Sequence, residues 1–319
     1  MRTLLASLMF LGLVGHRLAG DQVPLSTFMS EPAPENIVYA TRGDEKLILH
    51  TFRPAPSSAP RPAILWIHGG AWVGGTTDGF MPLARYTASR GLVSFNITYR
   101  LAKPGSVTLA DCVADCRSAL RYVRAHAAEL GVDPNRIAVA GDSAGGHLAA
   151  ALGTLPGFDH PDDDFAVSGR PDALLLYNPI VDLTEDDWIR YAVGGAALAD
   201  KKKTARPSDP AALAVARALS PLFHVAPGQP PALIQHGRGD RVVPYAQAER
   251  FAAAARAAGN RCDLILLGED IGHAFVIAAY KWPEPVVVEA VRAADRFLAS
   301  LGWLEGEPTL TSSNPPAWP

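Results

Sequence analysis

The chain has 319 residues, of which 48% are hydrophobic and 19% charged, a composition typical of an ordinary globular protein with one large core. Its formal net charge of −3 gives no basic field for a nucleic acid or another polyanion. The lysines at 201–203 form a short run typical of a solvated loop. We therefore expect one domain with tails and no nucleic-acid partner.

The first residues have the pattern of an export signal. Arg2 precedes an apolar stretch over 4–14, and the small residues Ala19 and Gly20 follow before Asp21. This predicts a signal peptide over 1–20 and a secreted or periplasmic protein. The apolar stretch is too short to span a bilayer, so we expect no membrane insertion after signal removal.

Strands and helices are predicted to alternate along most of the chain. Residues 36–40 and 46–53 favour an antiparallel hairpin, and the apolar run 62–68 is typical of a strand buried on both faces. The pattern then predicts a helix over 81–90, a strand over 92–101, a helix over 111–130, a strand over 136–140, a helix over 144–155 and a strand over 172–180.

Residues 183–220 interrupt this alternation with acidic, glycine, lysine and alanine patches, and we expect an inserted cap with short helices there. The alternation resumes with a strand over 231–236, a helix over 245–258, a strand over 262–267 and a helix over 284–301. This predicts an α/β fold, a mostly parallel sheet with helices on both faces, within a domain over 21–303. Residues 304–319 are rich in Pro, Ser and Thr and are expected to be disordered.

The three cysteines do not predict a cross-link or a metal site. Cys112 and Cys116 lie four residues apart on an expected helix, a spacing that suits a disulfide poorly. No second cysteine pair or clustered histidine supports zinc, so we expect no metal.

The segment 135–147 is an apolar strand that runs into a glycine-flanked serine and then a helix. A turn this sharp needs small residues two positions either side of its tip, and Gly141 and Gly145 meet that need around Ser143. The following helix directs its unpaired N–H groups and positive dipole end toward the tip. Ser143 is therefore the predicted nucleophile.

Two further loops carry matching chemistry at the carboxyl edge of the predicted sheet, where loops after parallel strands converge. Asp240 follows one buried strand, and His273 follows the last strand. A serine hydroxyl needs a base to take its proton and a carboxylate to orient that base, so we expect His273 and Asp240 in these roles. Asp270 and Asp263 are alternative acids, of which Asp263 lies at the wrong edge.

The tetrahedral intermediate of such a reaction needs backbone donors for its negative oxygen. The N–H groups of Ala144 and of Gly69 or Gly70 are the expected oxyanion hole, with Ala71 as a further candidate. Asp142 and His68 are interpreted as residues that fix these loops by hydrogen bonds. Three aromatic residues either line the substrate pocket or belong to the packing of core and cap: Trp72, Trp188 and Tyr191.

The sequences HGGAW at 68–72 and GDSAGG at 141–146, followed by Asp240 and the segment GHAF at 272–275, resemble the hormone-sensitive-lipase-like esterase branch of the α/β-hydrolases. The resemblance covers residues 35–303. It implies a cofactor-independent serine hydrolase of carboxylic esters with a small cap over its pocket. Ala71 departs from the usual third glycine, as in relatives that act on plant polysaccharides, and this puts activity on tertiary alcohols in doubt.

These observations lead to a predicted carboxylesterase that acts on small-molecule or polysaccharide-linked esters of short-chain or aromatic acids, with acetyl and feruloyl esters of plant polysaccharide as candidates. One alternative is an amide hydrolase, either a prolyl-oligopeptidase-like peptidase or an arylformamidase. Another is a non-catalytic binding module on a hydrolase scaffold, because fold alone does not establish function. The sequence leaves the oligomeric state open.

Overall fold

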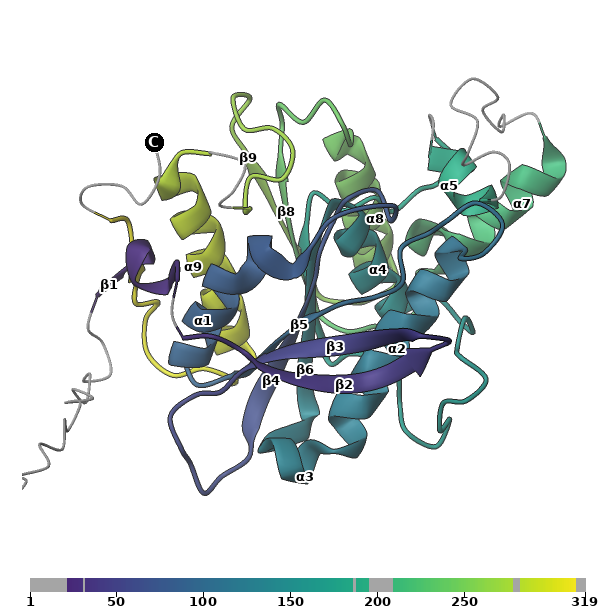
Figure 1. Ribbon diagram of the computed structural model, residues 1–319. Coiled ribbons are helices and arrows are strands. Elements are labelled where there is room, and N and C mark those ends of the chain that lie inside the picture. Colours follow the sequence, from purple (N-terminus) through teal and green to yellow (C-terminus); the bar gives the residue numbers. More distant parts are fainter. Residues whose placement is uncertain (1–21, 31, 186–187, 195–208, 278–281, 314–319) are drawn as a thin grey trace, which may run out of the picture.

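A computed structural model describes residues 22–30, 32–185, 188–194, 209–277 and 282–313 of the chain (Figure 1). The predicted signal peptide over 1–20 lies outside these residues. Within them, no helix is both long and apolar enough to cross a bilayer.

The centre of the fold is a sheet with the strand order β2-β3-β5-β4-β6-β7-β8-β9. β3 is antiparallel to both of its neighbours, and every pairing from β5 to β9 is parallel, which confirms the predicted mostly parallel sheet. The strands are β2 (Glu35–Arg42), β3 (Glu45–Phe52), β4 (Arg61–Ile67), β5 (Val93–Ile97), β6 (Val132–Asp142), β7 (Ala173–Tyr177), β8 (Ala232–Gly237) and β9 (Cys262–Leu267).

Helices cover both faces of this sheet (Figure 1). α1 (Met81–Ser89) and α9 (Glu284–Ser300) lie on one face, and α2 (Leu109–Ala125), α4 (Ser143–Thr154) and α8 (Tyr245–Ala257) lie on the other. The remaining helical segments are α3 (Ala127–Leu130), α5 (Ile189–Val193), α7 (Pro210–Leu219) and the 3₁₀ turns η1 (Leu25–Phe28), η2 (Thr77–Phe80) and η4 (Pro221–His224).

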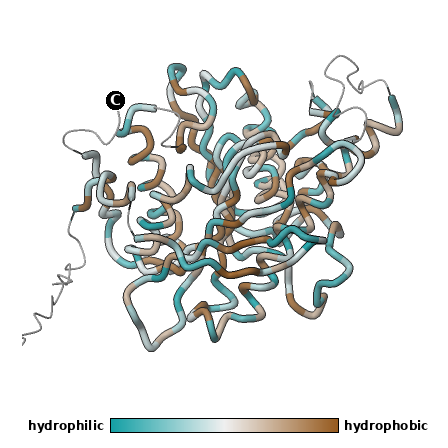
Figure 2. Tube along the Cα trace, in the orientation of Figure 1, coloured by the Kyte–Doolittle hydropathy of each residue, from teal (hydrophilic) through white to brown (hydrophobic). Residues whose placement is uncertain are grey.

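The continuous apolar runs of the central strands follow from this layering. In β4, Ile64 and Trp66 belong to the core cluster beneath α1 and α9, whereas Leu65 and Ile67 belong to the cluster beneath α2 and α4. Successive side chains of a strand point to opposite faces, so a strand buried on both sides must be apolar at every position. Figure 2 shows the resulting hydrophobic band through the middle of the molecule.

The prediction of a single helix over 111–130 is wrong, because two helices cover this stretch. α2 begins with a capping box between Thr108 and Asp111 and ends at Ala125, and His126 leaves the helical conformation before the short α3. The apolar pattern continues across the break because α3 also packs on the core, through Ala127 and Leu130.

The C-terminal segment is ordered as far as the structure describes it, so the predicted disorder over 304–319 is wrong for 304–313. β10 (Leu310–Thr311) pairs in parallel with β1 (Val23–Pro24), and Arg292 of α9 donates a hydrogen bond to the Leu310 carbonyl. Leu310 is fully buried in the cluster under α9. Two leucines, at 304 and 310, anchor a stretch whose Pro, Ser and Thr content suggested a free tail.

The predicted cap insertion at 183–220 falls between β7 and β8. Its described part contains α5 and α7, which pack against each other, and η4 follows directly (Figure 1). Residues 186–187 and 195–208 of this insertion lie outside the described residues.

Candidate active site

Ser143 lies at the junction of β6 and α4, in a left-handed backbone conformation with φ of 53°. A Cβ added at Gly145 would lie 2.1 Å from the Ile67 carbonyl oxygen, and one at Gly141 would lie 2.4 Å from the Gly145 backbone. Only glycine therefore fits at either flank, and this tight turn holds the serine at the start of α4.

The structure brings the three predicted catalytic side chains together at the carboxyl edge of the sheet. The Nε2 atom of His273 lies 2.8 Å from Ser143 Oγ, and its Nδ1 atom lies 2.7 Å from Asp240 Oδ2. The loop after β8 supplies Asp240, and the segment after β9 supplies His273. Of the alternative acids, Asp263 pairs instead with Arg261 at 2.8 Å, and Asp270 forms no hydrogen bond or ion pair with the imidazole, which pairs with Asp240.

Asp240 is held by several donors besides the imidazole. Its Oδ1 accepts hydrogen bonds from the backbone N–H groups of Val242 and Val243 at 2.8 and 2.9 Å, and His236 Nε2 lies 3.2 Å from Oδ2. Burial opposes ionisation of this carboxyl, but the bonds from His236, His273 and Val243 outweigh it and keep its pKa well below the usual range. Asp240 is therefore a carboxylate at neutral pH, as orientation of the imidazole requires.

The prediction that Gly69 is an oxyanion donor is wrong, because its N–H already forms a hydrogen bond within the protein. It donates to Asp142 Oδ1 at 3.0 Å. The N–H groups of Gly70 and Ala71 donate to no acceptor within the described residues, and that of Ala144 lies in the first turn of α4, where helical N–H groups have no intrahelical partner. The free amides beside Ser143 are therefore those of Gly70, Ala71 and Ala144.

An unusual backbone conformation presents these amides. Gly70, Ala71 and Trp72 all have positive φ, at 110°, 52° and 62°. The Gly70 carbonyl closes the turn by accepting from the N–H groups of Val73 and Gly74. Positive φ at two consecutive non-glycine residues costs free energy and persists only where surrounding contacts impose it.

His68 and Tyr99 supply some of those contacts. His68 Nδ1 lies 2.8 Å from the Gly69 carbonyl oxygen, and the Tyr99 ring stacks on the imidazole with centroids 4.5 Å apart. The Tyr99 hydroxyl also donates to the His68 carbonyl at 2.9 Å. Burial lowers the pKa of His68, so this imidazole is neutral at pH 7 and fixes the loop.

Of the two alternatives for Trp72, the structure contradicts the lining of the substrate pocket and supports packing in the core. Its side chain has no exposed surface, and its Nε1–H donates to His147 Nδ1 at 3.2 Å. Trp188 and Tyr191, at α5, are half-buried and pack on Trp72 with ring centroids 6.1 and 5.3 Å away. Trp72 therefore belongs to the core that joins the oxyanion loop to the insertion.

Asn178 is a site residue that the sequence did not single out. It follows β7 with φ of 36°, is fully buried, and its Oδ1 accepts from the backbone N–H of Ala274 at 3.2 Å. Ala274 directly follows His273 and also has positive φ, 57°. Asparagine is one of the few side chains that favour this backbone region, and this was the available signal.

Together, the fold, the strained serine at the tip of the β6–α4 turn, the Ser-His-Asp contacts and the free amides define an α/β-hydrolase with a nucleophilic serine site. The geometry is that of an acyl-transfer centre.

Comparison with known proteins identifies the family to which the chain belongs. It belongs to the BD-FAE family, which it matches over residues 49–254. It is 34% identical to Thermogutta terrifontis esterase 2 phosphorylated by paraoxon, with a TM-score of 0.74 over 86% of this chain and 97% of that one. Structures of the same esterase with bound propionate and bound butyrate are similar, with TM-scores of 0.73 and 0.74.

Two Mycobacterium tuberculosis proteins are also similar in sequence. The probable carboxylic ester hydrolase LipM is 30% identical over 60% of this chain and 44% of its own length. The esterase LipQ is 29% identical over 76% of this chain and 58% of its own length. The chain thus spans about half the length of these relatives. The matches confirm the resemblance to hormone-sensitive-lipase-like esterases.

Proposed function

We propose that this protein is a secreted serine carboxylesterase that hydrolyses short-chain or aromatic-acid esters through an acyl-enzyme. The observation that carries the proposal is the placement of Ser143 Oγ within 2.8 Å of His273 Nε2, with Asp240 on the other side of the imidazole. The three free amides beside the serine complete an acyl-transfer site.

Each group has a defined task in this reaction. Ser143 Oγ attacks the ester carbonyl while its proton moves to His273 Nε2, and Asp240 stabilises the imidazolium that forms. The N–H groups of Gly70, Ala71 and Ala144 bind the negative oxygen of the tetrahedral intermediate, where each is worth roughly 2.7–4 kcal/mol. His273 then protonates the leaving alcohol. Water then attacks the acyl carbon while it gives a proton to His273, and His273 passes this proton to Ser143 Oγ as the acid leaves.

The preference for short acyl groups is supported by the structures of a similar esterase and by the packing around the oxyanion loop. The similar Thermogutta terrifontis esterase 2 has been solved with propionate and with butyrate bound, acids of three and four carbons. In this chain the half-buried rings of Trp188 and Tyr191 lie against the oxyanion loop through Trp72. Aromatic side chains packed against the oxyanion loop suit a small acyl or aromatic acid.

Two parts of the proposal rest on the sequence. One is export, and the other is the choice of acetyl or feruloyl esters of plant polysaccharide as substrates. The segment 1–20 has the charged, apolar and small-residue regions of a signal peptide. The HGGAW form of the oxyanion loop, with alanine at 71, resembles esterases that act on such polymers.

Hydrolysis of p-nitrophenyl acetate, butyrate and octanoate, of methyl ferulate and of acetylated xylan tests this proposal, with p-nitroacetanilide as the matched amide. We expect kcat/KM to be higher for the acetate and the butyrate than for the octanoate. We expect kcat/KM for p-nitrophenyl acetate to exceed that for p-nitroacetanilide by more than about a hundredfold. An ester preference of only a few-fold would favour the amide-hydrolase alternative.

Labelling with a fluorophosphonate distinguishes the enzyme from a binding module. The native chain should be labelled and Ser143→Ala should not, whereas Ser57→Ala, in an exposed loop, should be labelled like the native chain. Absence of labelling of the native chain would contradict the proposal.

A further inference from the structure

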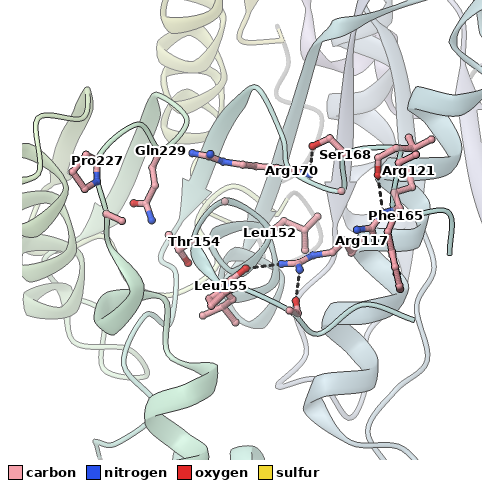
Figure 3. Close-up of a pocket in the computed structure, with 17 residues that line it drawn as sticks. Arg117, Arg121, Leu152, Thr154, Leu155, Phe165, Ser168, Arg170, Pro227 and Gln229 are labelled. Carbon is pink, nitrogen blue, oxygen red and sulfur yellow. Dashed lines mark hydrogen bonds between the residues drawn. The ribbon is translucent and has the colours of Figure 1, made fainter. Parts of the chain in front are cut away.

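A pocket that the proposed reaction does not use lies at the opposite edge of the sheet. α4 begins at Ser143 and is 12 residues long, so its last turn lies about 12–17 Å from the serine along the helix axis. That turn, the segments that precede β7 and β8, and two arginines of α2 enclose about 560 Å³. We call it the basic pocket, and it is lined by Arg117, Arg121, residues 152–157, residues 165–170, Ala226, Pro227 and Gln229 (Figure 3).

The charged side chains of the basic pocket are all positive. Arg117, Arg121 and Arg170 line it, and none of its lining residues is acidic. Arg117 and Arg121 belong to an ion-pair network in which arginines 42, 100, 117 and 121 alternate with aspartates 111, 115, 159 and 163. That network is electrically balanced, so Arg170 supplies the net charge.

Arg170 has no acidic partner among the described residues. Its guanidinium donates to the Gly228 carbonyl, and in Figure 3 the side chain reaches toward Gln229. It is exposed, so its remaining N–H groups are open to a ligand. A guanidinium presents a planar fork of donors that matches a carboxylate.

Arg117 adds a buried guanidinium to the wall of the pocket. Its side chain is only 7% exposed, pairs with Asp159 and donates to the carbonyl groups of Leu155 and Gly157, and its buried Nε atom has no hydrogen-bond partner among the described residues. A buried donor without an acceptor is costly, above all on a charged group. In Figure 3 its guanidinium lies beside Leu155, on the wall of the pocket.

The pocket also has an apolar wall. Phe165 is 63% exposed, the highest value among the large hydrophobic residues of the described chain, and the Arg121 guanidinium lies 5.5 Å from its ring centroid. Leu152, Leu155 and Val167 line the pocket with it. An exposed aromatic ring beside arginines offers a flat surface for a ring-shaped ligand.

We propose that the basic pocket binds a small carboxylate carried on a ring, either an aromatic acid or a uronic acid unit of a saccharide. The carboxylate pairs with Arg170, and the ring lies against Phe165. The volume is within the range of small-molecule sites. This inference does not depend on the esterase activity, because the pocket shares no residue with the triad or the oxyanion loop.

Calorimetric titration of the full chain with benzoate and with trigalacturonate tests the proposal, with benzyl alcohol and a neutral galactose oligomer as uncharged controls. We expect at least one acid to bind with a Kd below about 1 mM and its control to bind at least tenfold more weakly. Binding of benzoate alone would identify an aromatic acid as the ligand, and binding of trigalacturonate alone would identify a uronic acid unit.

Two variants locate the binding. Arg170→Gln should weaken binding of the acid at least tenfold, and Phe165→Ser should weaken it by severalfold, whereas Arg296→Gln, a 49% exposed arginine on α9, should have no effect. Both pocket variants should hydrolyse p-nitrophenyl acetate like the native chain. Binding of neither acid, equal binding of the controls, or binding unchanged by Arg170→Gln would overturn the proposal.

Discussion

The carboxylate of Asp142 accepts a hydrogen bond from the backbone N–H of Gly69 at 3.0 Å, and this contact joins the end of β6 to the loop after β4. Asp142 directly precedes the nucleophile, and Gly69 directly precedes the free amides of Gly70 and Ala71. The bond therefore fixes the nucleophile and the oxyanion donors relative to each other. Burial raises the pKa of Asp142 to about 6, although the nearby His273 and the Gly69 N–H favour the carboxylate.

Removal of this acceptor should impair catalysis without removing a reacting group. We expect Asp142→Ala to lower kcat about ten- to hundredfold with little change in KM, because the oxyanion donors lose their position. Asp142→Asn keeps an acceptor oxygen and should retain most of the activity. Steady-state kinetics with p-nitrophenyl butyrate measure both, and equal losses in the two variants would show that the Gly69 bond is not the cause.

Asp240→Asn should lower kcat by roughly 10⁴-fold, because an amide holds the imidazole in the wrong tautomer and does not stabilise its cation. Asp270→Asn is the matched control, since Asp270 lies three residues before His273 but forms no hydrogen bond or ion pair with it, and its kcat should stay within about twofold. A kcat loss for Asp270→Asn that matched the loss for Asp240→Asn would reassign the acid.

Asn178 should act as a positioning residue through Ala274. Asn178→Ala removes the acceptor of a buried N–H, which costs about 1–3 kcal/mol of unfolding free energy, and we expect kcat to fall about tenfold as His273 loses its support. Asn178→Asp retains the acceptor oxygen and should recover most of kcat. Urea unfolding and kcat should be measured together, and loss of stability with unchanged kcat would limit Asn178 to a structural role.

His147 should make stability depend on pH. Burial lowers its pKa to about 4, although its hydrogen bond to the Leu219 carbonyl acts in the opposite direction, whereas the unfolded chain titrates near 6.5. Between these values the unfolded state binds more protons, so acidification favours unfolding. From pH 7.5 to pH 5 this group should remove about 2 kcal/mol of stability.

A second group works against His147 over part of this range. Asp142 has a raised pKa, so the folded chain gains a proton before the unfolded chain does, and acidification from pH 6 toward 4 favours folding through this group. The difference between the native chain and His147→Gln cancels the contribution of Asp142. Urea unfolding of both proteins at pH 7.5 and 5 should therefore give a difference that shrinks by about 2 kcal/mol at pH 5, and a constant difference would rule out titration of His147.

Gly145→Ala should destabilise the fold by more than about 3 kcal/mol, because the added Cβ would lie 2.1 Å from a backbone oxygen that cannot move away. Gly74→Ala is the matched control in the neighbouring loop, where the nearest atom to the new Cβ is 3.8 Å away. Thermal unfolding should separate the two by several degrees at least, and similar melting temperatures would contradict the close approach at Gly145.

Short-range patterns in the sequence determined the alternation of strands and helices and the three loops that carry Ser143, Asp240 and His273. The reason is that buried parallel strands are apolar at every position, and loops that follow them meet at one edge of the sheet. The glycines on either side of Ser143 likewise predict a sharp turn that only small residues fit.

Only the tertiary structure decided which oxyanion amides are free, because the engagement of Gly69 depends on Asp142, 73 residues away. The placement of Trp72 in the core depends on His147 and α5, and the order of the C-terminal segment depends on β1 and α9. The basic pocket likewise joins α2, α4 and the segments before two strands. Contacts between residues distant in the chain follow from packing in three dimensions, which the periodicity of a single segment does not contain.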